Sequence, residues 1–273
     1  MVSDTPQAAT TPDQAAPGLP QFYRRPAAVN RERHANKSIT DAGFGFAADA
    51  NAVALNAVEL QHAARSYPIV FATTSPAIPI AVLGLREKQN LFIGGDGVWR
   101  PDTYIPAYVR RYPFIFSQTP GSTQLTLCVD EAAPHLVDGR ARPLFDGEKP
   151  TPHTDNALTF CMAFEAEREK TLPFAQALEE TGVLTENRAD INLNSGEKLQ
   201  IGGYRVIDQA KFEALPDARI LEFRQRGWLA PVYAHLVSMG CWQALLNLVG
   251  QAAKPAIRSN GAGTTNGSGT TSN

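Results

Sequence analysis

Residues 67–85 read YPIVFATTSPAIPIAVLGL and contain the two runs on which the fold depends. Tyr67–Phe71 and Ile80–Leu85 are short and rich in β-branched residues, and the residues between them are mostly Ser, Thr, Pro and Ala. Runs of this length, bounded by turn-forming residues, are typical of strands. We therefore expect antiparallel β-structure in the first half of the chain.

The same pattern continues at 90–93, 114–117 and 124–129, which extends the expected strands into a meander. One short helix is expected between these strands, over Thr103–Arg111. Its Tyr104, Tyr108 and Arg111 have helical spacing, Asp102 precedes it as an N-cap, and Pro106 falls in its first turn.

The middle of the chain changes to a helical period. Asp155 is placed to cap a helix in which Leu158, Cys161 and Glu165 share a face. Thr171 is placed to cap a second helix with Pro173 in its first turn, and Gly182 ends it. Two consecutive helices are predicted here.

A hairpin is predicted next, because apolar residues alternate at 191 and 193 and again at 199 and 201. Opposed residues share a face, so we pair 193 with 199 and 191 with 201 around a three-residue loop, Ser195-Gly196-Glu197.

The last third is predicted to be mixed. Helices are expected over 208–215, capped by Asp208, and over 217–226, ended by Gly227. Residues 232–237 are apolar on both faces and predict a central strand with His235 as a core residue. Ser238 is expected to cap a final helix whose buried stripe comprises Trp242, Leu245, Leu246 and Val249. The fold class is therefore α+β, a largely antiparallel sheet with packed helices.

Composition indicates one domain with unstructured ends. Residues 1–21 and 254–273 lack the large apolar side chains that would offset ordering, whereas 22–253 is continuously patterned. A net charge of -2 gives no general attraction to nucleic acid, and no apolar run reaches the length of a membrane span. Three widely spaced cysteines favour reduced thiols.

The N-terminal residues lack the basic and apolar regions of a Sec signal peptide. This favours a cytoplasmic location, with the cell surface reachable only through a signal-independent export route.

The sequence contains no recognisable catalytic, cofactor or metal motif. Cys128, His135, His153 and Cys161 do not form the close pairs of zinc sites. The glycines at 94, 95 and 97 fit a tight turn better than a phosphate-binding loop. We therefore predict no catalytic residue, no metal and no cofactor.

Two segments have both a functional and a structural interpretation. The loop Leu144–Asp155 contains Asp146, Glu148 and His153, which could bind a ligand together with Arg110 and Arg111 or simply form turns and a helix cap. The segment 104–114 interleaves aromatic residues with both arginines. Tyr104 and Tyr108 could form an interaction face for another protein, or the segment could pack on the core.

These segments also belong to an ordered series of motifs. The series comprises YPIVF at 67–71, QNLF at 89–92, Gly97 with Trp99, YIPAYVRRYPF at 104–114, Leu144-Phe145 with Gly147, GYRVID at 203–208, and GWL at 227–229 leading into YAHL at 233–236. In this order, over about residues 30–249, the chain resembles the SapC family.

The resemblance implies a bacterial protein with a surface-layer or envelope association and no catalytic residues to carry over. Our leading hypothesis is a non-enzymatic SapC-like protein. The alternative is a cytosolic enzyme or small-ligand binder with a polar site around the Leu144–Asp155 loop.

Overall fold

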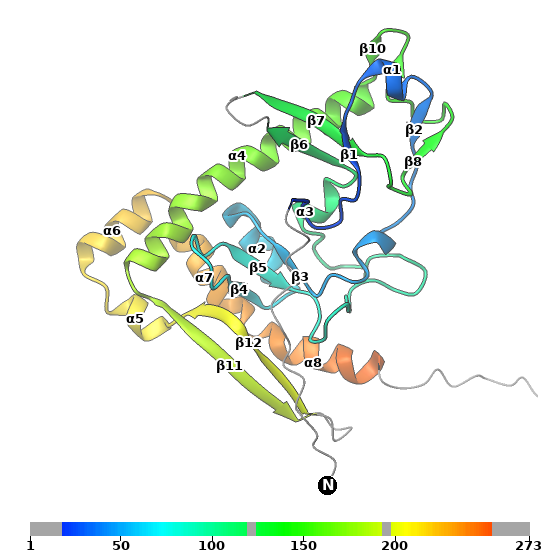
Figure 1. Ribbon diagram of the computed structural model, residues 1–273. Helices are drawn as coiled ribbons and strands as arrows, with labels where there is room; N and C mark the ends of the chain where they lie inside the picture. Colours follow the sequence, from blue (N-terminus) through cyan, green and yellow to red (C-terminus); the bar gives the residue numbers. More distant parts are fainter. Residues whose placement is uncertain (1–17, 119–123, 193–197, 253–273) are drawn as a thin grey trace, which may run out of the picture.

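The computed structural model describes residues 18–118, 124–192 and 198–252. The fold is α+β, as the sequence predicts, and one long helix crosses the molecule past two separate sheets (Figure 1). The predicted unstructured ends lie outside the described residues, apart from 18–21. In that short stretch the Gln21 amide already donates a hydrogen bond to the Ala52 carbonyl at 3.2 Å.

The larger sheet has five strands in the order β11-β12-β4-β5-β3, and all its pairs are antiparallel. The two runs from residues 67–85 are neighbours in it, with Ile69 opposite Ala81. Its strands are β3 (Ala52–Ala54), β4 (Ile69–Phe71), β5 (Pro79–Val82), β11 (Leu184–Asn192) and β12 (Lys198–Ile207).

The smaller sheet has the order β1-β7-β6, again antiparallel. The buried carboxylate of Asp130 fixes its outer strand by accepting hydrogen bonds from the backbone N–H groups of Arg24 and Arg25. The strands are β1 (Pro26–Ala28), β6 (Phe114–Gln118) and β7 (Leu125–Asp130), with two separate pairs, β2 (Lys37–Ile39) with β8 (Leu136–Asp138) and β9 (Phe145–Asp146) with β10 (Lys149–Pro150). The predicted single meander is therefore wrong, because its strands are divided between two sheets.

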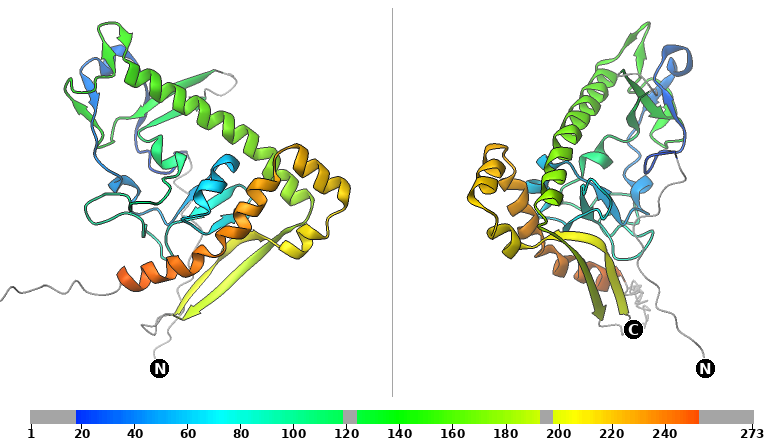
Figure 2. Two further views of the ribbon diagram at one scale, coloured as in Figure 1. Left: turned by 180° about the vertical axis from the view of Figure 1, so that it is seen from behind. Right: turned by 60° about the vertical axis from the view of Figure 1, so that its left-hand side comes forward.

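The helices follow the chain around these sheets. Helices α7 and α8 lie across the larger sheet in the left view of Figure 2, where α7 packs against β4 and β12. The helices are α1 (Arg31–His34), α2 (Leu60–Ala63), α3 (Ala107–Arg110), α4 (Pro152–Glu180), α5 (Gln209–Glu213), α6 (Asp217–Gln225), α7 (Leu229–Ser238) and α8 (Cys241–Ala252), with 3₁₀ turns η1 (Gly45–Ala47) and η2 (Ala57–Glu59).

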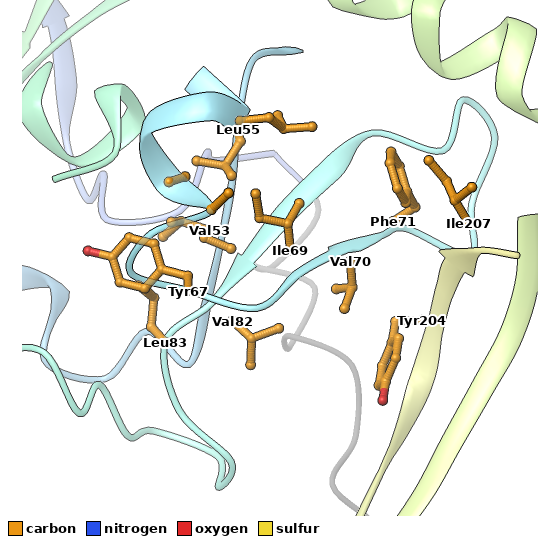
Figure 3. Close-up of a cluster of buried hydrophobic side chains, with 14 of the residues drawn as sticks. Val53, Leu55, Tyr67, Ile69, Val70, Phe71, Val82, Leu83, Tyr204 and Ile207 are labelled. Carbon is orange, nitrogen blue, oxygen red and sulfur yellow. The ribbon is translucent and has the colours of Figure 1, made fainter. Parts of the chain in front are cut away.

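The main core lies around the larger sheet. Figure 3 shows side chains from β3, β4, β5 and β12 gathered there, including Val53, Ile69, Phe71 and Ile207. Phe71 is fully buried, with its ring centroid 6.4 Å from that of Phe174 on α4 and 5.0 Å from that of His235 on α7. Burial of one such side chain contributes roughly 1.5–3 kcal/mol. Strand β4 therefore joins α4 to α7.

Among the described residues, no single helix has the length and hydropathy of a membrane span; α7 and α8 meet that standard only as a pair bent by 41°.

The helix predicted over Thr103–Arg111 is shorter than expected. α3 begins after Pro106, which occupies the N-cap, and Asp102 has a left-handed φ of 59° and does not cap. The first helical N–H, that of Ala107, instead donates to the buried Glu59 carboxylate at 2.7 Å. A remote side chain thus replaces the expected local cap.

The two helices predicted over 155–182 are one continuous helix, α4. Thr151 is its N-cap, Asp155 lies in the first turn, and Pro173 lies inside the helix. The Thr171 hydroxyl donates to the Glu167 carbonyl at 2.7 Å instead of starting a new helix. The predicted end is confirmed, since Gly182 has a φ of +66°.

The predicted hairpin exists, but its predicted register is wrong by two residues. Ile191 pairs with Leu199 rather than with Ile201, and the ladder shifts between Asn187 and Ala189. The predicted loop at 195–197 lies outside the described residues. An irregularity inside the ladder cannot be inferred from alternation alone.

The strand predicted at 90–93 is absent from the named strands; only Ile93 forms an isolated bridge, to Trp99. The Asn90 side chain accepts the N–H of Phe92 at 2.9 Å and donates to the Ala47 carbonyl at 3.1 Å. Such local side-chain bonds bend the backbone away from a ladder.

The strand predicted at 232–237 is the helix α7, and the expectation was wrong. A helix covered on several sides shows the same unbroken apolar pattern as a central strand. Ser238 ends α7 rather than capping α8, and its hydroxyl donates to the His235 carbonyl and accepts the Ile69 N–H. The predicted helices near 208–215 and 217–226 are confirmed, with Asp208 as the cap of the first.

Candidate functional site

A cavity of about 360 Å³ lies between the two sheets, beneath the middle of α4. Its walls come from the end of β3, from α3 and the residue after it, from β6 and from α4. Most of the lining is apolar and includes Leu55, Ile78, Ile115, Phe116 and Leu172. We call this cavity the Arg111 pocket, because Arg111 is the buried cation in its lining.

Arg111 is placed by the end of α3. It is the C-cap residue, its N–H donates to the Ala107 carbonyl, and β6 begins three residues later. Only 7% of the residue is exposed. Its guanidinium carbon lies 4.3 Å from the ring centroid of Tyr108 and 4.3 Å from that of Phe164. Aromatic faces attract cations, so these rings help to hold the buried charge.

The guanidinium is nevertheless poorly paired. Its Nη1 lies 3.6 Å from Oε1 of Glu165, which is too long for a hydrogen bond. The second oxygen of Glu165 accepts a bond from Nε of Arg168 at 2.6 Å. Nε of Arg111 is buried with no hydrogen-bond partner among the described residues. Glu165 is therefore shared between two arginines, and Arg168 makes the shorter contact.

Two groups near Arg111 that could attack as nucleophiles or transfer protons have raised pKa values. The thiol of Cys161 is buried, and burial raises its pKa to about 11, although the charge of Arg111 opposes the shift. Burial also raises the pKa of Tyr108, whose hydroxyl donates to the Gln21 carbonyl. Near neutral pH both groups remain protonated.

A smaller hollow of about 190 Å³ adjoins the Arg111 pocket, across Asn56 and Phe164. Its buried acid, Glu59, accepts bonds from the Tyr104 hydroxyl and from two backbone N–H groups. Arg110 lies over the Tyr104 ring and donates to the Tyr104 hydroxyl and the Ile105 carbonyl. These groups are satisfied, and they hold α3 in place.

The structure does not bring the predicted ligand-binding residues together. Asp146 and Glu148 are exposed on the β9–β10 hairpin, and Glu148 faces Arg31 at 3.6 Å. His153 lies in the first turn of α4, and its pKa is lowered by burial and by the charge of Arg142. Twelve residues of helix, about 18 Å, separate it from Glu165 beside Arg111.

The four predicted residues around α3 are also divided. Tyr104 and Arg110 border the smaller hollow, whereas Tyr108 and Arg111 line the Arg111 pocket. Tyr104 and Tyr108 are half-buried and Arg111 is buried, so they do not present one exposed aromatic and arginine face.

Sequence reasoning missed the α4 side of the pocket. Phe164, Arg168 and Leu172 line it but were not selected. The spacing of Glu165 and Arg168, three residues apart on one helical face, was the available signal. That spacing could not reveal that the face would meet Arg111.

Within the described ranges, no three His, Cys, Asp or Glu side chains gather closely enough to hold a metal ion. Of the residues considered for zinc, Cys128 and Cys161 are free and buried, and His135 contacts the Gly43 carbonyl through Nε2 at 2.9 Å.

The fold therefore defines an α+β protein in which one long helix spans two antiparallel sheets, with an apolar pocket of the size that small molecules occupy. The chain belongs to the SapC family, whose family model matches residues 29–245. Neither a curated protein nor a solved structure matches the chain.

Proposed function

We propose that this SapC-family protein is a non-enzymatic binding protein whose Arg111 pocket holds a small apolar ligand. The observation that carries the proposal is the cavity of about 360 Å³ with a mainly apolar lining and one buried cation. Ligand pockets of proteins are commonly of this size and lining, with a few polar groups that fix orientation.

Binding without chemistry is favoured by the state of the groups around the pocket. The thiol of Cys161 is protonated near neutral pH, and Thr171 uses its hydroxyl in bonds to the Glu167 carbonyl and the Ala57 N–H. A nucleophile needs a lowered pKa or a neighbouring base, and a general base needs a pKa near the working pH. The described lining supplies a buried cation, aromatic ring faces and apolar walls, and its carboxylate, Glu165, is bonded to Arg168.

A surface-layer or envelope association is the second part of the proposal, and family analogy alone supports it. Cell fractionation tests it directly. Recovery with the envelope or the medium supports the association, whereas recovery only in the cytoplasm would leave the binding proposal standing without it.

The pocket itself is tested with a neutral apolar fluorophore, N-phenyl-1-naphthylamine, titrated into the full chain. The wild type is expected to bind it with saturable fluorescence enhancement. Leu172→Trp fills the pocket from α4 and should weaken binding about tenfold or more.

Leu158→Trp is the matched control, because this residue lies on the same helix, is 37% exposed and does not line the pocket. It should bind the fluorophore as the wild type does. Equal binding by the wild type and Leu172→Trp would refute the proposed site.

A further inference from the structure

We infer that the Arg111 pocket selects an apolar ligand that carries a single carboxylate, because its lining combines apolar walls with a buried guanidinium whose one ion pair is long and whose Nε has no partner in the described chain. This inference rests on the proposed function and specifies its ligand class. Three features carry it: the missing partners of Arg111, the charges in the lining and the shape of the guanidinium.

The first feature is the shortage of well-placed acceptors around a buried cation. Arg111 is 93% buried, its Nε has no partner among the described residues, and its Glu165 contact of 3.6 Å exceeds hydrogen-bond length. A guanidinium has five N–H donors, and a buried charge left without acceptors is costly. An anionic ligand in the adjoining cavity would supply them.

The second feature is the balance of charge in the lining. Glu165, the anion of the lining, bonds to Arg168 at 2.6 Å, so Arg111 is the buried cation that no carboxylate meets at hydrogen-bond distance in the described chain. Arg168 also contacts Glu169 at 2.5 Å, and both side chains reach solvent, where water screens their charges. One negative charge on the ligand therefore completes the balance inside the cavity.

The third feature is geometric. The flat fork of N–H groups on arginine matches the two oxygens of a carboxylate in a bidentate pair. A phosphate monoester would bring about two negative charges, one more than the lining compensates, into a mainly apolar cavity. A carboxylate is therefore favoured over a phosphate.

The remainder of the ligand is set by the walls. Leu55, Ile78, Ile115 and Leu172 come from four different segments and enclose the cavity beside the guanidinium. An apolar carbon chain or ring would bury its surface there without removing a polar group of the ligand from water. The ligand class is thus a monocarboxylate with a hydrocarbon body, and decanoate is a suitable probe.

The test compares decanoate with decanol and decyl phosphate, which share the same chain, by ligand-observed NMR on the full-length protein below micelle-forming concentrations. Wild-type protein should bind decanoate about tenfold or more tightly than decanol, because hydrogen bonds to charged groups give that order of discrimination. Decyl phosphate should bind more weakly than decanoate.

Arg111→Met is the deciding variant. It should lose about tenfold or more in affinity for decanoate and keep its affinity for decanol within about threefold. Arg168→Met is the matched control, because it removes a lining charge bonded to the same Glu165 from a side chain that is 47% exposed. It should weaken decanoate binding by less than about threefold.

Arg111→Lys keeps the positive charge and removes the forked N–H donors of the guanidinium. It tests the carboxylate inference if Arg111→Met does not fold. It should lose most of the preference for decanoate over decanol. Unchanged preference in Arg111→Lys would overturn the bidentate carboxylate.

The binding results distinguish failure of the carboxylate inference from failure of the proposed binding function. Equal affinity of the wild type for decanol and decanoate, tighter binding of decyl phosphate, or equal losses in Arg111→Met and Arg168→Met would each overturn the carboxylate while the pocket stands. Absence of binding by all three probes and by the neutral fluorophore would overturn both.

Discussion

Arg205 and Arg111 both meet a glutamate of α4, yet their surroundings differ. Arg205, on β12, donates to the carbonyls of Ala72 and Thr74 and to Glu179 Oε1 at 2.8–2.9 Å. Arg111 has one ion pair at 3.6 Å and a buried Nε without a partner in the described chain. An arginine with its donors bonded holds the fold together, whereas one lacking acceptors beside a cavity is placed to bind.

The Arg205 contacts, here called the Arg205 clamp, predict the largest loss of stability. Arg205→Met removes the donor of two carbonyls and the ion pair of a largely buried Glu179, which keeps its bond from the Ser75 hydroxyl, and should lower the free energy of unfolding by about 3 kcal/mol. Urea unfolding followed by circular dichroism measures it. A loss below about 1 kcal/mol would remove the contrast between the two arginines.

The region of the clamp should also respond to acid through His235. Burial lowers the pKa of His235 to about 4, while its Nε2 accepts the Ile207 N–H. The unfolded chain binds a proton at higher pH than the folded chain does. The stabilisation is therefore complete above about pH 6.5 and decreases by about 2 kcal/mol by pH 5.

Comparison with His235→Gln isolates this effect. The difference in unfolding free energy between wild type and variant should shrink by about 2 kcal/mol from pH 7 to pH 5. A difference that stays constant over this range would show that His235 does not titrate as the buried ring requires.

The Arg111 pocket predicts the smallest change in stability. Arg111→Met replaces an underpaired buried cation by an apolar side chain, while Glu165 keeps its bond to Arg168. The free energy of unfolding should change by no more than about 1 kcal/mol in either direction. The same urea titration measures it, and a loss equal to that of Arg205→Met would make Arg111 a structural residue.

Local patterns predicted the elements that depend on neighbours in sequence. The strands near 67–71, 114–117 and 124–129, the Asp208 cap and the stop at Gly182 all follow from side chains within a few residues. The fold class followed because these elements are antiparallel and mixed with helices.

Elements decided by distant contacts were mispredicted. α3 begins where Glu59 accepts its first N–H, 48 residues away in sequence. The strand β1 pairs with β7 across about a hundred residues, and nothing in Pro26–Ala28 indicates this. The division into two sheets, and hence the cavity between them, depends on such pairings.

The candidate site was found only in part for the same reason. Arg111 and Tyr108 were selected from the alternation of arginines and aromatic residues, which is a local signal. Their partners on α4 lie about fifty residues away, and the packing of α4 against β6 and η2 brings them together. The loop at 144–155 is conspicuous in sequence, but its acidic residues 146 and 148 lie on the exposed β9–β10 hairpin near the first turn of α4.

Pro173 has a mechanical consequence for the pocket. Proline lacks the N–H that would bond to the carbonyl of Glu169, so α4 misses one rung of its ladder next to the wall residues Thr171 and Leu172. The helix is fastened on both sides of this point, by its Thr151 cap and by Glu179 in the Arg205 clamp. Thr171 anchors the helix at this point by accepting the Ala57 N–H at 2.8 Å, so a contact to η2 holds the cavity wall beside the missing helical bond.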